Sequence, residues 1–418
     1  MTRPLLDVGV IGGGTAGCAV ALLLSRQGHA VTVYERVAVP GPVGAGITLQ
    51  PTGLHVLEEL GVYDAVGSRG ARIDRLACTT PTGRTVIELS YGDVSPAAFG
   101  VGMHRGALFA ALFSAAKSAP GVTFRLGLAA EDLRRASTRG WQWILDDAGV
   151  AHGPHQLIVV CDGARSHLRD DTHVRKSIDR YPWGALWFVG DDPVIGGAPV
   201  LRQVVRGSSW MVGLLPTGLG PDPTNETPLV SLFYSIREDA VPAWRARGLE
   251  AWKDEVRASV PDAATLLDQV TDADQLLFAA YHDVVMDPWN TSNVVYLGDA
   301  AHAMSPQLGQ GANLALFDAW VLAEALAAEP YLPLALDRYT RARRGHLGFY
   351  QFATRALTPF FQGDEPWFGV LRDLFMPLAA WLPPTRWFMT AAMTGAIESF
   401  TGRRIAVADP RRVGPLVK

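Results

Sequence analysis

A glycine-rich turn between an apolar run and a helix limits what the start of this chain can fold into. Asp7–Ile11 is a continuous apolar segment, Gly12 to Gly17 match G-x-G-x-x-G, and an Ala- and Leu-rich segment follows over Thr15–Gln27. A second apolar run, Val31–Glu35, completes the unit. This order predicts a βαβ unit in a parallel sheet covered on both faces, and therefore an α/β fold.

Each glycine of the turn has its own task in binding a dinucleotide. Gly12 permits the tight turn, Gly14 lets a pyrophosphate approach the backbone, and Gly17 lets helix and strand pack closely. The helix N-terminus then presents free amides to the phosphates. Glu35 ends the second strand, where a carboxylate can accept hydrogen bonds from the adenosine ribose, which favours FAD or NAD over NADP.

A second pattern far downstream chooses between these dinucleotides. Gly298-Asp299 follows a short apolar run, and the loop Pro306–Asn313 opens an apolar helix over Gly311–Ala328. The Asp299 carboxylate can bind the hydroxyls of a ribityl chain, which only a flavin has. Backbone amides of the glycine-rich loop can face the pyrimidine edge of the ring, where negative charge accumulates on reduction. The pair of patterns predicts FAD.

A third motif, D-G-x-x-S-x-x-R, covers Asp162 to Arg169. It lies between the first two motifs in the chain. With the three motifs in this order, the chain resembles the para-hydroxybenzoate hydroxylase type of FAD-dependent aromatic monooxygenase, a class A flavoprotein monooxygenase. The resemblance spans about residues 7–328. It implies a Rossmann-like FAD-binding domain of the glutathione-reductase type, an inserted, mainly antiparallel β-sheet substrate domain and a helical C-terminus. In relatives the third motif is linked to both FAD and the nicotinamide donor.

The resemblance also implies an activity. NADH or NADPH reduces non-covalently bound FAD, O2 forms a C4a-hydroperoxyflavin, and one oxygen atom hydroxylates or epoxidises an aromatic or lipophilic small molecule. Two alternatives stay open at this point. One is an FAD-dependent reductase or dehydrogenase similar to the geranylgeranyl reductases, and the other is a non-catalytic flavin-binding protein.

The resemblance adds two elements to the cofactor site. Arg105 begins a helix predicted over Arg105–Ser118, where the family has an arginine near the flavin's phosphate or ribityl part. Gly46 lies in a loop that runs along the flavin ring in the family, although this chain has Gly44 where some relatives have an arginine. The predicted cofactor-binding residues are Gly12, Gly14, Thr15, Ala16, Gly17, Glu35, Arg36, Gly46, Arg105, Asp162, Asp299, Pro306, Gly309, Gly311, Ala312 and Asn313.

Catalytic and substrate residues are less constrained by the sequence. Pro306 is placed near the oxygen-reacting face of the flavin by the resemblance alone, and His282 is a candidate base for a phenol. His302 and Asp318 are interpreted as structural residues. Candidate substrate contacts are the aromatic side chains of the middle sheet, each of which could instead belong to the core: Trp183, Trp187, Trp210, Tyr234 and Tyr281.

The order of the segments predicts a discontinuous domain organisation. Alternating segments between Tyr181 and Tyr281 interrupt the nucleotide-binding pattern and predict a largely antiparallel sheet. An apparent hairpin over Arg72–Ser90 adds to it. The expected division is an FAD-binding domain at 1–71, 98–175 and 283–350, a substrate domain at 72–97 and 176–282, and a helical region at 351–418.

The composition limits the classes of partner and the cellular compartment that we expect. The 418 residues carry a formal net charge of −4 and only three cysteines, without metal-ligand spacing, so we expect no nucleic acid, no metal and a reducing compartment. No apolar run reaches the roughly 20 residues of a membrane span, and no signal peptide is apparent, which predicts a cytoplasmic protein. The C-terminal region is rich in Trp, Phe and Pro. It could cap a lipophilic substrate, touch a membrane, form a homodimer face or simply pack as helices over the flavin domain.

Overall fold

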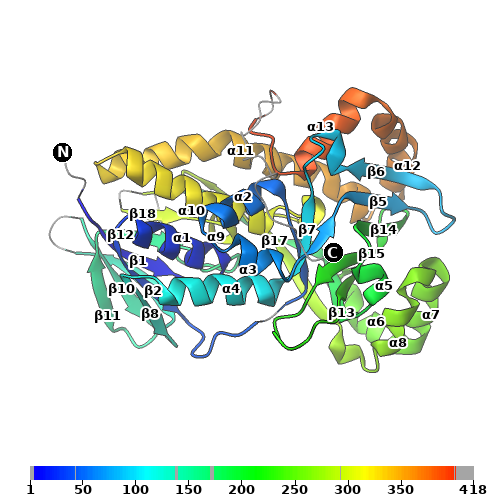
Figure 1. Ribbon diagram of the computed structural model, residues 1–418, viewed down its shortest axis with the longest axis horizontal. Coiled ribbons are helices and arrows are strands. Elements are labelled where there is room, and N and C mark those ends of the chain that lie inside the picture. The colour runs from blue at the N-terminus through cyan, green and yellow to red at the C-terminus, as the bar shows by residue number, and fades with distance from the viewer. Residues whose placement is uncertain are drawn as a thin grey trace.

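The computed structural model describes residues 4–42, 44–136, 140–169, 174–291, 293–399 and 401. Two large sheets organise the molecule, one in each half, and helices cover them (Figure 1). The fold is of the predicted α/β class, with an FAD-binding half, a mainly antiparallel sheet and a helical C-terminal region.

The first sheet is parallel, as the βαβ pattern predicts. Its strands lie in the order β18-β12-β1-β2-β8, and each pairs in parallel with its neighbour. Their side chains form the centre of the largest core cluster. The strands are β1 (Asp7–Ile11), β2 (Ala30–Glu35), β8 (Val122–Leu126), β12 (Leu157–Val160) and β18 (Val294–Tyr296).

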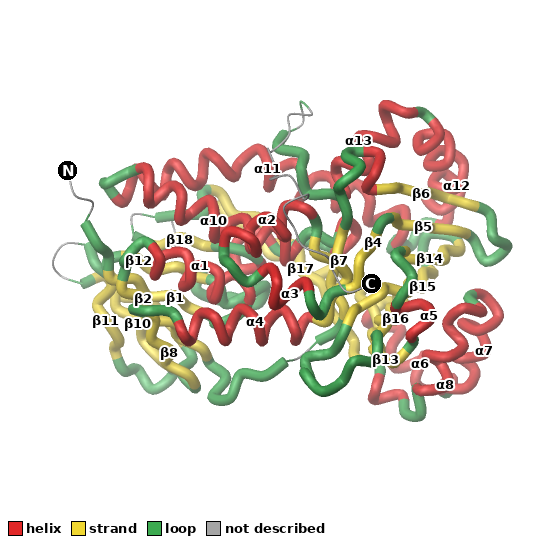
Figure 2. Tube along the Cα trace, viewed as in Figure 1, coloured by secondary structure: helices red, strands yellow, loops and turns green. Residues whose placement is uncertain are grey.

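Two neighbouring residues of β1 show what covers this sheet. Gly9 and Val10 point to opposite faces. A Cβ on Gly9 would meet the His155 ring at 2.7 Å, whereas Val10 lies 3.4 Å from where a Cβ on Gly17 would be. A three-stranded sheet therefore covers one face and helices cover the other (Figure 2). The elements are β9 (Ala130–Arg135), β10 (Gln142–Asp146) and β11 (Ala151–His155), against α1 (Thr15–Arg26), α4 (Arg105–Ser118) and α10 (Gly311–Ala328).

The second sheet has seven strands in the order β17-β13-β16-β15-β14-β5-β6. All of its pairs are antiparallel except β14 with β5. One face packs against three helices in a separate core cluster. The strands are β5 (Arg75–Thr79), β6 (Thr85–Ser90), β13 (Arg175–Asp191), β14 (Val200–Arg206), β15 (Trp210–Gly218), β16 (Leu229–Arg237) and β17 (Leu277–Asp287), and the helices are α6 (Val241–Arg247), α7 (Leu249–Ser259) and α8 (Ala264–Gln269).

A small sheet joins the two halves. It consists of β3 (Gly46–Leu49), β7 (Gly100–His104) and β4 (Ala71–Ile73), and β7 packs against β15 of the seven-stranded sheet. The approach is so close that a Cβ on Gly102 would overlap the carbonyl oxygen of Pro216. This contact sets the seven-stranded sheet beside the loop that contains Gly46.

The C-terminal region is helical in its described part. It contains α11 (Leu332–Phe361), α12 (Pro366–Trp381) and α13 (Pro383–Met393), and residues 402–418 lie outside the described residues. Within the described chain, α10 alone is long and apolar enough to cross a membrane, but most of it is buried against α1, α2 (Pro51–Glu59) and α11, as expected of a core helix.

Candidate flavin site

The three sequence motifs meet at the carboxyl ends of adjacent strands. Backbone hydrogen bonds connect Cys161 N to Ile11 O at 2.7 Å and Leu297 N to Val160 O at 3.0 Å, just where β1, β12 and β18 end. The loops that follow these strands therefore lie side by side. This edge of a parallel sheet is where open α/β folds bind their ligands.

The glycine turn shows three different steric environments. Gly12 has φ +97°, and a Cβ there would lie 2.6 Å from the carbonyl oxygen of Cys161. A Cβ on Gly17 would overlap the carbonyl oxygen of Gly12, so α1 can pack on the turn only with glycine there. A Cβ on Gly14 would meet nothing within 4 Å, which leaves its side of the turn open in front of Thr15, the first residue of α1.

Glu35 is tied to the same turn. Its carboxylate accepts hydrogen bonds from the backbone amides of Gly13 at 2.8 Å and Val37 at 2.9 Å. A carboxylate offers about four acceptor positions, so it can also accept from ribose hydroxyls. Arg36 follows with an exposed side chain. The predicted adenosine end of the site is thus assembled around one carboxylate.

The downstream loops place a second carboxylate beside a helix N-terminus. Asp299 is exposed at the start of α9 (Asp299–His302), and its Oδ1 lies 3.9 Å from where a Cβ on Gly311 would be. Gly311 begins α10, after the left-handed residue Gly309 at φ +61°. Ala312 lies in the first turn of α10. The amides of that turn and the Asp299 carboxylate therefore face the same space.

Asn313 holds two of the predicted flavin loops together. Its side chain is fully buried, and its amide nitrogen donates to the carbonyls of Thr48 and Gly309, each at 3.0 Å. Its carbonyl oxygen accepts from Gln50 N at 2.7 Å. The side chain thus fastens the strand that starts at Gly46 to the loop containing Pro306. Its contacts are those of a positioning residue.

Arg169 makes a similar connection for the third motif. Its buried guanidinium donates to the carbonyls of Ala300 at 2.5 Å, Asp299 at 3.2 Å and Gly163 at 3.0 Å. The D-G-x-x-S-x-x-R segment is thereby fastened to the loop of Asp299. Asp162 opens this segment, and its Oδ1 is a buried acceptor without a hydrogen-bond partner among the described residues. Burial raises the pKa of Asp162.

Arg105 lies over the loop next to Gly46. It is exposed at the first position of α4, and its backbone amide donates to Ala45 O at 3.1 Å. Gly44 has φ +106°, and a Cβ there would approach the Arg105 Cδ to 3.1 Å. The backbone at Gly44 therefore favours glycine where some relatives have arginine, and Arg105 supplies the cation at this place.

These features fit FAD. Gly14 and Gly163 leave space that any side chain would occupy, and Asp162 has a buried oxygen that awaits a donor. Carboxylates, exposed arginines and a helix N-terminus surround that space. Glu35 and Arg36 would hold the adenosine end, while Asp299, Arg105 and the first turn of α10 would hold the ribityl and ring end.

A buried charge cluster behind the site was not predicted from the sequence. Asp318 accepts from Gly298 N at 2.9 Å, from His302 Nε2 at 2.5 Å and from Arg343 Nε at 2.7 Å. Burial alone would raise the pKa of Asp318, but the charges of His302 and Arg343 outweigh it and lower the pKa to about 2. Arg343 also contacts His346, which donates to Gly395 O at 2.9 Å. The cluster links the Gly-Asp turn to the C-terminal region.

The predicted substrate residues divide between the two faces of the seven-stranded sheet. Trp187 and Phe233 are partly exposed, with ring centroids 5.0 Å apart, and Trp187 hydrogen-bonds Tyr281. Trp210 and Tyr234 instead pack with the helices on the opposite face, which favours their alternative interpretation as core residues. Side chains alternate between the two faces of a strand, so the sequence pattern alone does not tell which face a given aromatic residue occupies. The register of strand pairing decides this.

Two further candidates have distinct surroundings. Trp183 shares the Trp187 side by register, and its buried Nε1 has no hydrogen-bond partner among the described residues. His282 pairs with Arg180 and follows Tyr281, so it points to the other side of β17. Burial and the positive charges of Arg180 and two arginines of the third motif lower the pKa of His282.

Comparison with known proteins gives a consistent assignment. The family model described as an FAD binding domain matches residues 5–347. The 3-hydroxybenzoate 6-hydroxylase of Klebsiella oxytoca is 28% identical over 334 residues, which cover 76% of this chain and 79% of that protein. The kynurenine 3-monooxygenase of Salinispora tropica is 30% identical over 376 residues, which cover 83% of this chain and 78% of that protein.

Solved structures share the fold. The probable FAD-dependent monooxygenase PqsL of Pseudomonas aeruginosa aligns with a TM-score of 0.73 at 24% identity, over 88% of this chain and 100% of that chain. At this identity the likeness shows the fold alone, while the family match and the curated relatives carry the function. The chain therefore belongs to the FAD binding domain family, with FAD as its cofactor, and is an FAD-dependent monooxygenase of the para-hydroxybenzoate hydroxylase type.

Proposed function

We propose that this monooxygenase hydroxylates a small aromatic molecule that lies against Trp187 and Phe233 on the seven-stranded sheet. Two partly exposed rings on a sheet face support this position, because aromatic pairs favour offset or edge-on contact with a further ring. The names of the curated relatives, a hydroxybenzoate hydroxylase and a kynurenine monooxygenase, support the substrate class.

One observation carries the proposal. Two predicted flavin loops are fastened to the same side of β16, on either side of Phe233. Gly46 N donates to Ser231 Oγ at 2.9 Å. Gln307 donates to Gln362 at 2.9 Å, and Gln362 donates to Ser235 Oγ at 3.0 Å.

Residues 231, 233 and 235 of β16 point to one side of the sheet because side chains alternate along a strand. A flavin ring held between the two loops would therefore face Phe233. Gly213 lies opposite, and a Cβ there would overlap the Phe233 ring. The missing side chain lets that ring lie flat on β15.

The chain's own groups have three tasks in this scheme. The carboxylates and arginines bind FAD, which when bound supplies the chemistry that moves electrons from NADH or NADPH to O2 and delivers one oxygen atom. The aromatic face, which consists of Trp187 and Phe233, orients the substrate ring and excludes water from it. Pro306 is exposed and adjoins Gln307, which supports a position for it beside Trp187 and Phe233.

Proton transfer from a phenolic substrate stays a prediction. Burial and the nearby arginines lower the pKa of His282 and so favour the neutral imidazole, which is the form that can accept a proton. Its direction on β17 favours the loop of Asp299 over the aromatic face. The buried Nε1 of Trp183 is a donor on the aromatic side that a substrate oxygen could accept from.

Adjacent residues of β16 offer a matched test of the substrate position. We expect Phe233→Ala to raise KM for an accepted phenol by about tenfold, since losing an aromatic contact and its buried area costs about 1–2 kcal/mol. Less of the NAD(P)H consumed should then appear as hydroxylated product and more as H2O2. Tyr234→Phe, on the opposite face, should leave KM and coupling unchanged.

The readouts are initial rates of NAD(P)H oxidation, product by chromatography and H2O2 by peroxidase assay, after phenols and aminophenols have been screened for stimulated oxidation. Equal effects of Phe233→Ala and Tyr234→Phe would contradict the proposed position of the substrate. FAD content of each purified variant serves as the control for folding.

A further inference from the structure

The end of α11 is fastened to the loop that contains Pro306. A hydrogen bond joins Thr358 Oγ1 to Ser305 Oγ at 2.9 Å, and Gln307 Nε2 donates to Gln362 Oε1 at 2.9 Å. Gln362 N also donates to Thr358 O at 2.7 Å, so these two residues lie one helical turn apart on the same side of α11. One turn of the C-terminal region therefore holds the residues immediately before and after Pro306.

Gln362 also contacts the seven-stranded sheet. Its side chain is buried, and its Nε2 donates to Gly184 O at 3.2 Å and to Ser235 Oγ at 3.0 Å. A glutamine amide has two N–H donors and one acceptor oxygen, and in Gln362 both donors and the oxygen are hydrogen-bonded. The side chain of Gln362 therefore joins three parts of the protein, which are the loop of Pro306, strand β13 and strand β16.

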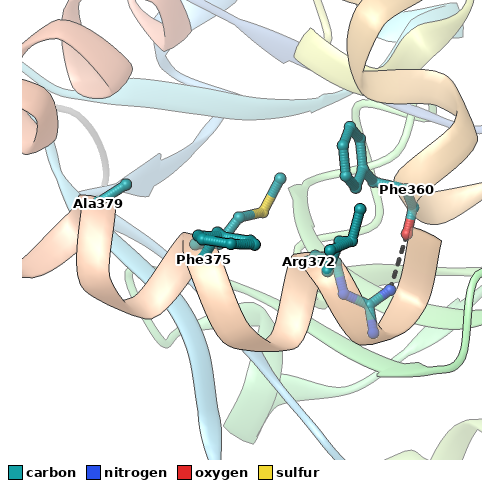
Figure 3. A pocket seen from close by; sticks show the side chains of 6 residues that line it. Phe360, Arg372, Phe375 and Ala379 are labelled. Carbon is teal, nitrogen blue, oxygen red and sulfur yellow. Dashed lines mark hydrogen bonds between the residues drawn. The ribbon is translucent and has the colours of Figure 1, made fainter. Parts of the chain in front are cut away.

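Neighbouring elements hold this end of α11 in place. Arg372 of α12 is buried, and its guanidinium donates to Phe360 O at 2.9 Å (Figure 3). A cation at this position also interacts favourably with the carbonyl end of the helix dipole. Gly363 N donates to Ser208 O at 2.9 Å, which ties the residue after Gln362 to the turn between β14 and β15. Gln362 therefore lies on a supported part of the chain.

The C-terminal region holds the same loop at a further point. Gln310 is buried, and its Nε2 donates to the carbonyl of Met393, the last residue of α13, at 2.7 Å. Residues 305, 307 and 310 of the loop are thus all hydrogen-bonded to the C-terminal region. Two residues within this stretch, Pro306 and Gly309, are predicted FAD contacts. The hydrogen bonds therefore fix the loop at the place where it would meet the flavin.

We propose that Gln362 is a positioning residue that sets the distance between the loop of Pro306 and the aromatic face. The inference rests on the proposed substrate position, because Ser235 lies two residues from Phe233 on the same side of β16. Transfer of an oxygen atom requires the reacting groups to be held closely, and small displacements cost rate. When the substrate ring lies too far away, the hydride of NAD(P)H and one proton convert O2 to H2O2, and the substrate leaves unchanged.

Two buried glutamines of α11 provide a matched test in the FAD-loaded enzyme. Gln362→Leu removes the three side-chain hydrogen bonds with little change in volume. We expect KM for an accepted phenol to change less than about threefold, since the aromatic face is intact, and the ratio of H2O2 to hydroxylated product to rise at least about fivefold. Gln351 is also buried, but its side chain donates to Val284 O of β17 at 2.8 Å. Gln351→Leu should therefore keep the native ratio.

The absorption spectrum of bound FAD gives a readout that needs no turnover. Adding the phenol without NAD(P)H should shift the visible spectrum of the native enzyme, because the substrate ring packs beside the flavin. In Gln362→Leu we expect a similar Kd for the phenol but a shift at most about half the native size, because the loop no longer holds the flavin at its native distance. Gln307→Leu should change both readouts in the same direction. The double variant should go no further than Gln362→Leu, since the two substitutions remove one shared hydrogen bond.

FAD content and thermal unfolding show which variants are folded, and Gln307→Leu carries the test if Gln362→Leu does not fold. The proposal is overturned if Gln362→Leu and Gln351→Leu give equal ratios of H2O2 to product. It is also overturned if the effects of Gln307→Leu and Gln362→Leu are additive in the double variant. A native KM in Phe233→Ala would instead contradict the proposed substrate position, so the two failures can be told apart.

Discussion

Asp318 is the buried charge on which the turn of Gly298 and Asp299 depends. It receives one backbone amide, one imidazole and one guanidinium, and its side chain is fully buried. The buried ion pairs of Asp318 agree with the interpretation of Asp318 and His302 as structural residues. The sequence alone could not pair them, because an acid within an apolar helix looks the same whether it faces water or a buried cation.

We expect Asp318→Asn to lower the free energy of unfolding by about 3–5 kcal/mol, because Arg343 would keep a buried charge without its counterion. FAD affinity should fall as well, since the Gly298 amide loses a charged acceptor. Urea unfolding and FAD titration measure the two effects. Glu324→Gln is the control, as Glu324 lies on the same helix but is exposed. Equal losses in both variants would contradict the role of Asp318.

The same carboxylate predicts how stability depends on pH. The pKa of Asp318 is lowered to about 2, mainly by His302 and Arg343 acting against burial. A carboxyl whose pKa is lower in the folded state stabilises the fold above its ordinary pKa, and this contribution is lost as pH falls through the folded pKa. We therefore expect about 2 kcal/mol of stability to be lost between about pH 4 and pH 2. Urea unfolding measured at several pH values in that range should show that the free energy of unfolding depends less on pH in Asp318→Asn than in the native protein.

At the scale of elements, the sequence predicted best where local signals mark both ends. The helices over Arg105–Ser118 and Gly311–Ala328 have the predicted bounds. The sequence predicted the ends of elements less well where contacts with distant parts of the chain determine them. Helix α11 continues to Phe361 because Tyr350, Gln351 and Thr358 are held by buried partners, so Pro359 does not end it.

Substitutions at two glycines of the same turn distinguish an effect on packing from an effect on FAD binding. We expect Gly17→Ala to destabilise the protein by about 1–3 kcal/mol, because its methyl group would overlap the Gly12 carbonyl. Gly14→Ala meets no neighbour and should keep its stability, but should weaken FAD binding at least about tenfold by blocking the pyrophosphate. Thermal unfolding of the FAD-free proteins and fluorescence titration with FAD measure these effects. Native FAD affinity in Gly14→Ala would show that the turn does not hold the pyrophosphate.

At the scale of the whole molecule, the candidate flavin site lies at the carboxyl ends of the parallel strands, beside the small sheet that packs against β15. That Asp299, Asp162 and Glu35 lie at one edge of the parallel sheet could be predicted, because each stands where a strand of that sheet ends. The proposed substrate face could not be predicted, since the proposal depends on how β16 pairs with β13 and on the loops fastened to Ser231 and Ser235. That register selects Trp187 and Phe233 over Trp210 and Tyr234. We retain the proposed division into discontinuous domains because it keeps β5 and β6 with the seven-stranded sheet.

The origin of the oxygen atom in the product tests the central claim most directly. The purified FAD-loaded enzyme would be supplied with NADH or NADPH and an accepted phenol under 18O2 in ordinary water, and the product analysed by mass spectrometry. We predict one 18O atom on the aromatic ring per product molecule and no product without oxygen. Unlabelled product, or equal turnover under argon, would contradict monooxygenation and support a reductase or dehydrogenase instead.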